Sequence, residues 1–342
     1  NRQFRPVEAS KVSGYAMEYE CRQPQRLEIE SYVIDLLLDY RAATTVYAYP
    51  TVWRLRLLWS SRVWEPAQDV QIWEDDAGHA IGFALLWRRW RESPYLALER
   101  VIHPALATDA LVDAMLAWVV QRAQAISAEQ AAPLTLFANR LHPAIHLDDP
   151  LETHGFTPIP SNPEQYNVYL KRALDTPLDE PSLPLGYTLR ALQSIEELEV
   201  YAALSSFTAV DAEHRRETLA SDEYCHLVAV DPPGDFAAYV ECSFCRDEWT
   251  RTGQRVGWID YIETRPEQQR RGLGLAVLLA GLRQLREWGA ETAMLITAST
   301  NTPALALYEA SGFERLNMPE MPGYESFITF DASLPLARES RP

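Results

Sequence analysis

The stretch Gln269-Arg270-Arg271-Gly272-Leu273-Gly274 joins a predicted strand, Val256–Thr264, to a helix predicted over residues 272–288. The helix is predicted because its apolar residues fall on one broad face and Gly289 is a typical C-terminal stop. Glycines in a strand-to-helix turn let backbone N–H groups approach a ligand, and a helix N-terminus carries about half a positive charge. With two arginines alongside, this 269–274 loop predicts a pyrophosphate cradle, although a structural turn with surface arginines has the same composition.

The 269–274 loop does not match two common phosphate-binding turns. A dinucleotide-binding turn needs Gly-x-Gly-x-x-Gly and a later acid for the ribose, and a Walker loop ends in Gly-Lys-Ser or Gly-Lys-Thr. Neither pattern is present here. These two classes of nucleotide-binding protein are therefore excluded.

A second motif follows about 30 residues later, running from Asn301 through Ala304, Leu307 and Tyr308 to Gly312-Phe313. The spacing of Ala304, Leu307 and Tyr308 places them on one face of a helix. That face carries one phenol among small apolar side chains. Taken alone, it is more typical of a core tyrosine with a satisfied hydroxyl group.

The two motifs together resemble the GNAT superfamily of acyl-CoA-dependent N-acetyltransferases. The resemblance is strong over residues 256–316 and extends by element order over residues 187–330. It implies an α/β fold in which a mixed, mostly antiparallel sheet is flanked by helices. It also implies acetyl-CoA as co-substrate, bound where the strand before the loop splays from its neighbour.

The resemblance carries specific roles onto residues of this chain. Backbone groups of the strand end would bind pantetheine and the acyl carbonyl, the loop would bind the pyrophosphate, and an asparagine would lie on the cofactor side. These cofactor-binding positions are Ile262, Glu263, Thr264, Gln269, Arg270, Arg271, Gly272, Leu273, Gly274 and Asn301. Tyr308 falls at the position of the general acid near the thioester sulfur. No metal is implied.

The general base is expected on the strand Val256–Thr264. Alternation places Trp258, Asp260, Ile262 and Thr264 on one face and Tyr261 and Glu263 on the other, and a bulge would swap the later residues. Asp260 is the preferred base. Glu263, a water relay or the absence of a dedicated base remain alternatives.

The two halves of the chain share landmarks. Pro104 and Pro266 each end a predicted strand, and Gly155-Phe156 and Gly312-Phe313 each follow a helix-length segment. This pattern predicts a duplication, with a degenerate GNAT-like domain over residues 1–174, a proline-rich linker over 175–185, a catalytic GNAT domain over 186–332 and a tail over 333–342. An offset of 162 places Thr108, Asp109 and Ala110 where the loop has Arg270, Arg271 and Gly272, so the chemical markers are lost from the first half. The tandem arrangement resembles the mycothiol synthases.

Composition limits the partners of the protein. The 342 residues include 31 basic and 48 acidic side chains, a net charge of −17, which disfavours nucleic acids and anionic membranes. Residues 1–174 carry 17 basic and 21 acidic side chains, and residues 175–342 carry 14 and 27. An acidic field in the second half would attract a cationic amine. Four cysteines are too few for a disulfide framework, which predicts a cytoplasmic protein.

The preferred function is direct transfer of an acetyl group from acetyl-CoA to a small amine within a ternary complex, by a monomer or homodimer. A non-catalytic acyl-CoA-binding regulator and an acetyltransferase acting on proteins or peptides are the alternatives. Residues 207–217, including Asp211, Glu213 and His214, lie where GNAT proteins close over the acceptor. They are candidate acceptor-side residues.

Overall fold

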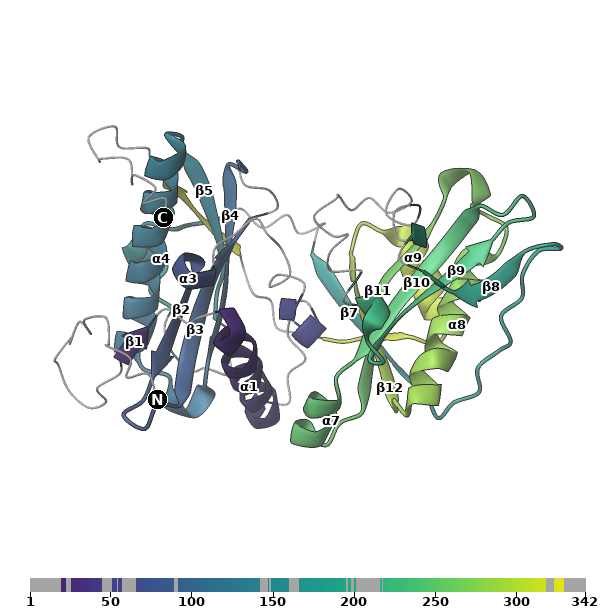
Figure 1. Cartoon of the computed structure of the whole chain (residues 1–342), viewed down its shortest axis with the longest axis horizontal. Coiled ribbons are helices and arrows are strands. Elements are labelled where there is room, and N and C mark those ends of the chain that lie inside the picture. Colours follow the sequence, from purple (N-terminus) through teal and green to yellow (C-terminus); the bar gives the residue numbers. More distant parts are fainter. Residues whose placement is uncertain are drawn as a thin grey trace. The chain divides into compact units, whose positions relative to one another are not determined.

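The structure is a computed structural model that describes residues 20–22, 26–44, 51–53, 55–56, 66–88, 92–141, 147, 149–159, 166–194, 196–197, 200, 216, 218–317 and 323–328. The chain divides into two compact units. The first unit comprises Asn1–Ser161 with Pro319–Pro342, and the second comprises Asn162–Met318. Each unit is built on one seven-stranded mixed sheet (Figure 1). The predicted α/β fold class is confirmed.

The first unit combines its sheet with helices on both faces. Its strands are β1 (Glu20–Arg22), β2 (Val70–Glu74), β3 (Ala80–Trp87), β4 (Tyr95–Ile102), β5 (Leu134–Asn139), β6 (Thr157–Pro158) and β14 (Gly323–Ile328). Its helices are α1 (Arg26–Thr44), α3 (Pro66–Asp69), α4 (Asp109–Gln130) and the 3-10 turns η1 (Pro104–Leu106) and η3 (Glu152–His154). Figure 1 shows α4 and α1 on opposite sides of this sheet.

The second unit has the same kind of composition. Its strands are β7 (Asn167–Ala173), β8 (Thr188–Ala191), β9 (Tyr224–Val230), β10 (Phe236–Phe244), β11 (Val256–Thr264), β12 (Thr292–Ala298) and β13 (Glu314–Arg315). Its helices are α7 (Arg246–Thr252), α8 (Leu273–Trp288), α9 (Thr302–Ala310) and the 3-10 turn η4 (Pro266–Gln268).

Strand order identifies the two sheets as copies of one design. The first sheet runs β1-β2-β3-β4-β5-β14-β6, and the second, read in the same direction, runs β8-β9-β10-β11-β12-β7-β13. In each sheet the fourth and fifth strands form the parallel pair, β4 with β5 and β11 with β12, while every other neighbouring pair is antiparallel. The predicted duplication is therefore visible in the topology.

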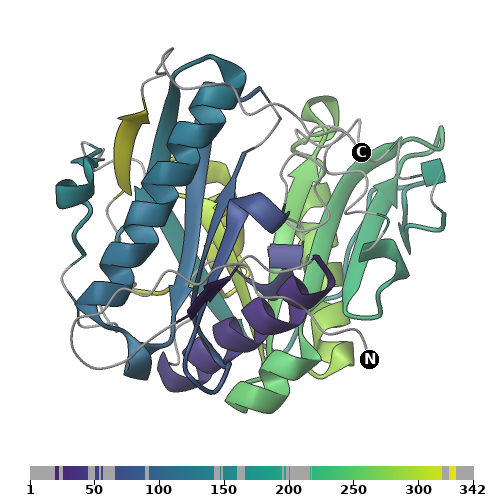
Figure 2. The same ribbon diagram turned by 60° about the vertical axis from the view of Figure 1, so that its left-hand side comes forward.

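The sixth strand of each sheet comes from the far side of the expected domain boundary. Strand β14 pairs with β5 of the first unit, and β7 pairs with β12 of the second. Figures 1 and 2 show the yellow β14 among the blue strands of the first unit. The expected division at residues 174 and 186 is therefore wrong, because β7 from the expected first domain joins the second sheet and β14 from the expected second domain joins the first. The local pattern of residues predicts that a segment is a strand, but it does not predict which strand it pairs with.

The expected linker over residues 175–185 also lies inside the second unit, between β7 and β8. Leu178 is buried in the core of that unit. The guanidinium group of Arg283 on α8 donates hydrogen bonds to the carbonyl oxygens of Leu178 and Asp179, and it forms an ion pair with Glu180 at 2.7 Å. The prolines and acids suggested a solvated spacer, but the interspersed leucines anchor the segment against α8.

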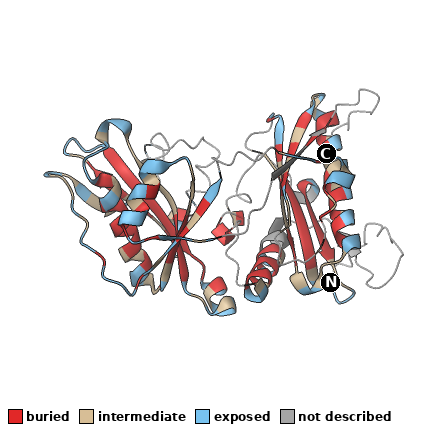
Figure 3. Cartoon of the chain, turned by 180° about the vertical axis from the view of Figure 1, so that it is seen from behind, coloured by how far each residue is buried: buried red, intermediate tan, exposed pale blue. Residues whose placement is uncertain are grey.

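The core of the second unit lies between its sheet and α8. Strand β10 is buried along its whole length, and the apolar face of α8 packs against β10 and β11 (Figure 3). The contact is close at Gly257, where a Cβ atom would lie 2.6 Å from the Cδ2 atom of Leu285. Only glycine lets this strand approach the helix so closely. Among the described helices, none combines the length and apolarity required to cross a membrane.

Candidate active site

The parallel pair at the centre of the second sheet is paired only at its beginning. Val256, Gly257 and Trp258 of β11 pair with residues of β12, the last pair being Trp258 with Met294. Both strands are described throughout, and both continue beyond this point, to Thr264 and Ala298. From Ile259 onwards, no strand of the described residues pairs with the edge of β11 that faces β12. This is the splayed strand that the resemblance implies.

Backbone alternation determines which groups of β11 point to the unpaired edge. The N–H group of Arg265 donates to Ala237 on the β10 side. Because neighbouring residues in a strand point their backbone groups to opposite edges, those of Ile262 and Thr264 face the β12 side. Consistent with this, the Thr264 carbonyl oxygen accepts a hydrogen bond from the Gln269 side chain at 3.2 Å. Glu263 instead accepts a hydrogen bond from the Tyr239 hydroxyl group at 3.0 Å.

A β-bulge places Asp260 in the site. Along β10, Glu241 pairs with Tyr261 and Cys242 pairs with Ile259, so Asp260 is the extra residue of β11. Ile259 and Ile262 pack on the α8 side, whereas Tyr261 packs against Tyr239 on the opposite face. The bulge thus swaps the later residues, as the sequence analysis allowed, and Asp260 and Tyr261 both lie on the face away from α8.

The environment of Asp260 makes it an unusual carboxyl group. Burial raises its pKa to about 8; the nearby Ser243 hydroxyl group opposes this rise, and the charge of Glu241 adds to it. Its Oδ2 atom is buried and has no hydrogen-bond partner within the described part of the chain. A carboxyl group with a pKa near 8 is a much stronger proton acceptor, once ionised, than an ordinary aspartate.

The 269–274 loop leaves a row of donors unused. Arg270 and Gly272 both have left-handed backbone conformations, with φ of 62° and 84°. Gly272 is the N-cap of α8 and provides no side-chain cap. Over the described residues, no backbone N–H group from Arg270 to Leu275 donates a hydrogen bond, the first turn of the helix being closed by Ala276 to Gly272. These amides, at a helix N-terminus with two arginines, fit an anion.

The remaining predicted residues, Asn301 and Tyr308, lie at the start of α9 and within it, after β12. Asn301 is the N-cap of α9, and its side chain accepts a hydrogen bond from the Ala304 N–H group at 3.4 Å. Tyr308 is only 5% exposed, and its burial raises its pKa to about 12. Its ring packs edge-on to Phe313 with the centroids 6.0 Å apart. Leu307, on the same helix, would contact a Cβ atom added to Gly274, so α9 lies against the start of α8.

The corresponding turn of the first unit has a different construction. Its 3-10 turn η1 has Ala107 as C-cap, and the next residue, Thr108, is the N-cap of α4. In the second unit, the corresponding C-cap Gln269 and N-cap Gly272 are separated by two arginines. The offset of 162 is therefore wrong beyond Ala107. The two arginines are an insertion, and Gly272 corresponds to Thr108. The Thr108 hydroxyl accepts a hydrogen bond from Leu111 N–H at 3.2 Å, so this helix is capped by its own side chain.

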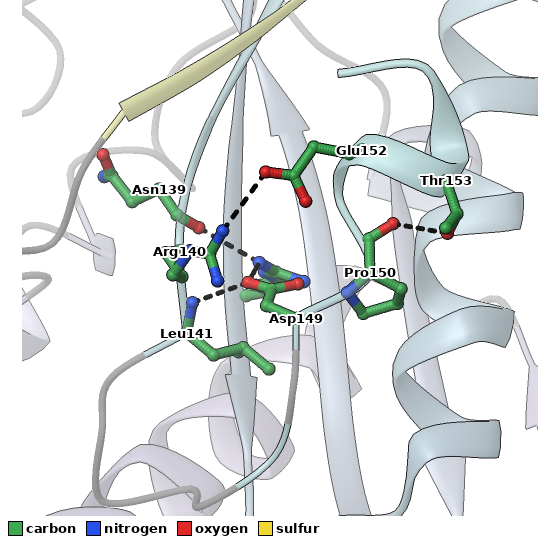
Figure 4. Close-up of polar contacts among 8 residues, drawn as sticks. Asn139, Arg140, Leu141, Asp149, Pro150, Glu152 and Thr153 are labelled. Atoms are coloured by element: carbon green, nitrogen blue, oxygen red, sulfur yellow. Dashed lines mark hydrogen bonds and ion pairs between the residues drawn. The ribbon is translucent and has the colours of Figure 1, made fainter. Parts of the chain in front are cut away.

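The parallel pair of the first unit also parts after three residue pairs, but a buried ion pair bridges the strands there. Arg100 of β4 donates to the Asn139 carbonyl oxygen at the end of β5 and forms an ion pair with Asp149. Both side chains are almost fully buried, at 4% and 1% exposed. Figure 4 shows Asp149 also accepting from the Leu141 N–H group, and Arg140 reaching Glu152. Protein side chains thus occupy the place where β11 and β12 are left apart.

Sequence reasoning missed a buried polar cluster behind Asp260. Glu241 on β10 is 3% exposed and accepts a hydrogen bond from the Tyr224 hydroxyl group at 2.5 Å. His226 Nδ1 lies 3.6 Å from the same carboxylate, and its Nε2 atom lies 2.7 Å from the Thr218 hydroxyl oxygen. The available signal was Glu241 itself, since it is the one charged residue of the strand Phe236–Phe244.

Two further expectations concern metals and the acceptor side. No group of three or more His, Cys, Asp or Glu side chains that could hold a metal occurs among the described residues. The acceptor-side candidates Asp211, Glu213 and His214 lie outside those residues, as does the tail over residues 333–342.

A comparison with protein families agrees with this geometry. Residues 190–313 match the family model described as Acetyltransferase (GNAT) family, so the second unit contains a GNAT acetyltransferase domain. The match ends at Phe313, and it includes the splayed strand, the 269–274 loop and Tyr308.

Among curated proteins, the chain is similar to several mycothiol acetyltransferases. The protein from Salinispora tropica is 33% identical over 163 residues, which cover 43% of this chain and 50% of that protein. The protein from Thermobispora bispora is 30% identical over 161 residues, covering 44% and 55%. The chain thus spans about half the length of the curated relatives it matches.

Among solved structures, about nine-tenths of the chain superposes on GNAT proteins, one of which is described as a tandem GNAT protein. A tandem GNAT protein from the clavulanic acid biosynthesis pathway superposes with a TM-score of 0.64 at 18% identity, covering 92% of this chain and 100% of that one. A GCN5-related N-acetyltransferase from Sphaerobacter thermophilus gives a TM-score of 0.60 at 17% identity, covering 91% and 96%. At these identities the likeness concerns the fold, which is that of a tandem GNAT protein.

Proposed function

We propose that the second unit is an N-acetyltransferase that transfers an acetyl group from acetyl-CoA directly to the amine of a small acceptor. The observation that carries the proposal is the combination of an unpaired β11 edge with the open donors of the 269–274 loop immediately after it. An extended ligand that ends in a pyrophosphate would form hydrogen bonds with both the unpaired edge and the donors of the loop.

The residues that would hold acetyl-CoA lie along the open edge of β11 and in the 269–274 loop. The backbone groups of Ile262 and Thr264 would pair with the pantetheine amides as a neighbouring strand does, and the amides from Arg270 to Leu275 would bind the pyrophosphate. Arg270 and Arg271 add positive charge, which a phosphate favours. When bound, acetyl-CoA supplies an acetyl group activated as a thioester.

Asp260 serves as the general base. A primary amine is mostly protonated near neutral pH and must lose a proton before it can attack a carbonyl carbon. Asp260 lies on the face away from α8, on the strand whose edge is open, and its elevated pKa suits it to accept that proton. Backbone N–H groups of the unpaired β11 edge would stabilise the oxyanion that forms.

Tyr308 serves as the general acid. The thiolate of CoA is expelled when the tetrahedral intermediate collapses, and a proton donor nearby assists its departure. Because burial raises the pKa of Tyr308 to about 12, its hydroxyl group keeps its proton at neutral pH and can donate it. The same reasoning explains why a buried phenol is placed on an otherwise apolar helix face.

The acceptor is a small molecule bearing an amine, with a preference for a cation. Asp260, Glu241 and Glu263 lie along β10 and β11. Two buried polar atoms on the face that carries Asp260, its own Oδ2 atom and Trp258 Nε1, have no partner among the described residues. Buried polar atoms without partners require an explanation, and a polar ligand supplies one. The names of the mycothiol acetyltransferases support a small molecule rather than a protein as acceptor.

The test is release of thiol from acetyl-CoA, measured over a panel of small amines, diamines and peptides. We expect turnover with small cationic amines, and loss of turnover in the double variant Asp260→Asn/Tyr308→Phe. Tight binding of acetyl-CoA with no turnover on any amine would instead indicate an acyl-CoA-binding regulator. Turnover confined to peptides would indicate a protein-directed enzyme.

A further inference from the structure

The proposed mechanism leaves the buried polar cluster around Glu241 without a role. Glu241 lies on β10, directly opposite His226 of β9 and Tyr261 of β11. It accepts a 2.5 Å hydrogen bond from Tyr224, whose own pKa is raised well above its usual value by burial and, next, by the charge of Glu241. The tyrosine therefore stays protonated and keeps donating to the carboxylate.

A buried carboxylate is costly, and the first unit shows that this fold does not need one at the position of Glu241. The registers of the two sheets align residue by residue, so Leu85 of β3 occupies the place of Glu241, and Val70 of β2 occupies that of His226. Both are fully buried. Strands β3 and β4 pair without a bulge, so Asp260 has no counterpart at all. The acid pair is thus confined to the unit with the open cofactor loop, and replacing buried ions by apolar side chains is often neutral or stabilising.

We propose that Glu241 is a positioning residue for the base: its buried negative charge beside Asp260 makes Asp260 the stronger proton acceptor, and Tyr224 and His226 hold that charge in place. This inference rests on the proposed function of Asp260. The sign follows from electrostatics, because a fixed negative charge opposes the formation of a second one in the same apolar surroundings.

Other polar groups also face this pair, and their positions limit the alternatives. The groups on β9, β10, β11 and the segment before β9 are Tyr224, His226, Tyr239, Cys242, Ser243, Tyr261, Glu263 and Thr218. Ser243 acts on Asp260 in the opposite sense to Glu241, since its hydroxyl group lowers the pKa. Glu263 is engaged by Tyr239. Glu241 is therefore the charged group that the structure couples to Asp260.

The test is the dependence of kcat/KM on pH in Glu241→Gln, with acetyl-CoA and the best amine of the panel. Activity requires ionised Asp260, so the wild-type profile rises with pH towards about 8. Removal of the Glu241 charge should shift this acid limb to lower pH by about one unit. The acceptor amine titrates identically in both proteins, so the shift belongs to the enzyme. A purely structural role would lower stability and leave the limb in place.

Two further variants keep the test decisive. Glu248→Gln removes an equally buried carboxyl group on α7, away from the pair, and should leave the limb unmoved. His226→Val/Glu241→Leu installs the residues that the first unit packs at these positions, so it should fold even if Glu241→Gln does not, and it should show the same downward shift. An unshifted limb in both Glu241 variants overturns the inference while leaving the proposed function intact. Full activity in Asp260→Asn overturns the inference together with the assignment of Asp260 as the base, whereas absence of turnover on every amine overturns the proposed function.

Discussion

The two units place corresponding strands in the same order and with the same directions, yet they differ at every position where the second unit carries chemistry. Where the second has the extra residue Asp260, the first has regular pairing; where the second has Glu241 and His226, the first has Leu85 and Val70. The turn before the long helix lacks the two inserted arginines in the first unit. One bulge and one two-residue insertion thus separate a chemically equipped site from a filled one.

The two units also differ in the groups that lie where their parallel strands diverge. In the second unit the edge of β11 stays open and the α8 amides stay without acceptors in the described structure. In the first unit Arg100 crosses to Asn139 and pairs with Asp149, and Thr108 caps the helix. The fold therefore produces the splay in either case, and the side chains decide whether it can receive a ligand.

The largest expected effect comes from the residue that the first unit lacks. Asp260→Asn should lower kcat/KM by about 10²–10⁴-fold, the usual contribution of a general base, while acetyl-CoA still binds. Deletion of Asp260 should remove the bulge, so that β10 and β11 pair as regularly as β3 and β4 do in the first unit. The resulting protein should be folded and inactive. Steady-state kinetics, together with calorimetric binding of acetyl-CoA, measure both. Unchanged kcat/KM in either variant would contradict the assignment of the base.

The next effect concerns stability rather than activity. Asp149→Ala leaves the Arg100 guanidinium buried without its partner, and the loss of one member of a buried ion pair costs about 3–5 kcal/mol. Denaturant unfolding of the full chain measures this. Glu152→Gln is the matched control, because its pair with Arg140 is exposed and should contribute at most about 1 kcal/mol. Equal effects of the two substitutions would show that the buried pair does not hold the first unit together.

The double variant Arg270→Ala/Arg271→Ala removes the side chains that the first unit lacks at this turn. Both side chains are exposed, so together they should contribute about 1.5–3 kcal/mol, the magnitude of one charged hydrogen bond, and the KM for acetyl-CoA should rise roughly 10–100-fold. Because these contacts are the same in the ground and transition states, kcat should be unchanged. A fall in kcat with constant KM would place the arginines in the chemical step instead.

A smaller effect is expected at Tyr308. Tyr308→Phe keeps the ring and its packing against Phe313 but removes the proton donor. A thiolate is a good leaving group even without protonation, since the pKa of a free thiol is about 8.5. We therefore expect kcat to fall only about tenfold, with the KM for acetyl-CoA unaltered. Single-turnover rates would reveal whether the loss lies in chemistry, and an unaffected rate would remove Tyr308 from the mechanism.

A separate prediction concerns the stability of the resting protein as a function of pH. The pKa of Asp260 is raised in the folded state to about 8 from an ordinary value of 3.8, so the folded state holds the proton more tightly than the unfolded state. Stability from this group is present below about pH 4 and is lost as pH rises towards 8. Asp260→Asn should remove that slope. Parallel slopes for wild type and variant in denaturant titrations at pH 5, 6, 7 and 8 would show that Asp260 titrates normally.

The sequence predicted the elements of the second unit well because their signals are local. The apolar face of α8, its stop at Gly289 and the motif from Asn301 to Phe313 each depend on neighbouring residues. The exchange of β7 and β14 was missed, because nothing within a strand records which sheet it joins.

Register explains the other differences. Counting along the chain paired Gly272 with Ala110, and only the structure shows that two arginines are inserted there. Within the site, alternation alone could not place Asp260, because a bulge depends on the partner strand. The lone acid of the strand Phe236–Phe244 was visible in the sequence, but its partners Tyr224 and His226 come from another strand.

A crystal structure determined with acetyl-CoA tests most directly whether only one of the two related units binds the cofactor. The account predicts one molecule per chain, extended along the open edge of β11 with its pyrophosphate on the amides of Arg270 to Leu275, and none at Thr108 of the first unit. A second, fully occupied acetyl-CoA beside Thr108, with Arg100 and Asp149 displaced, would contradict it.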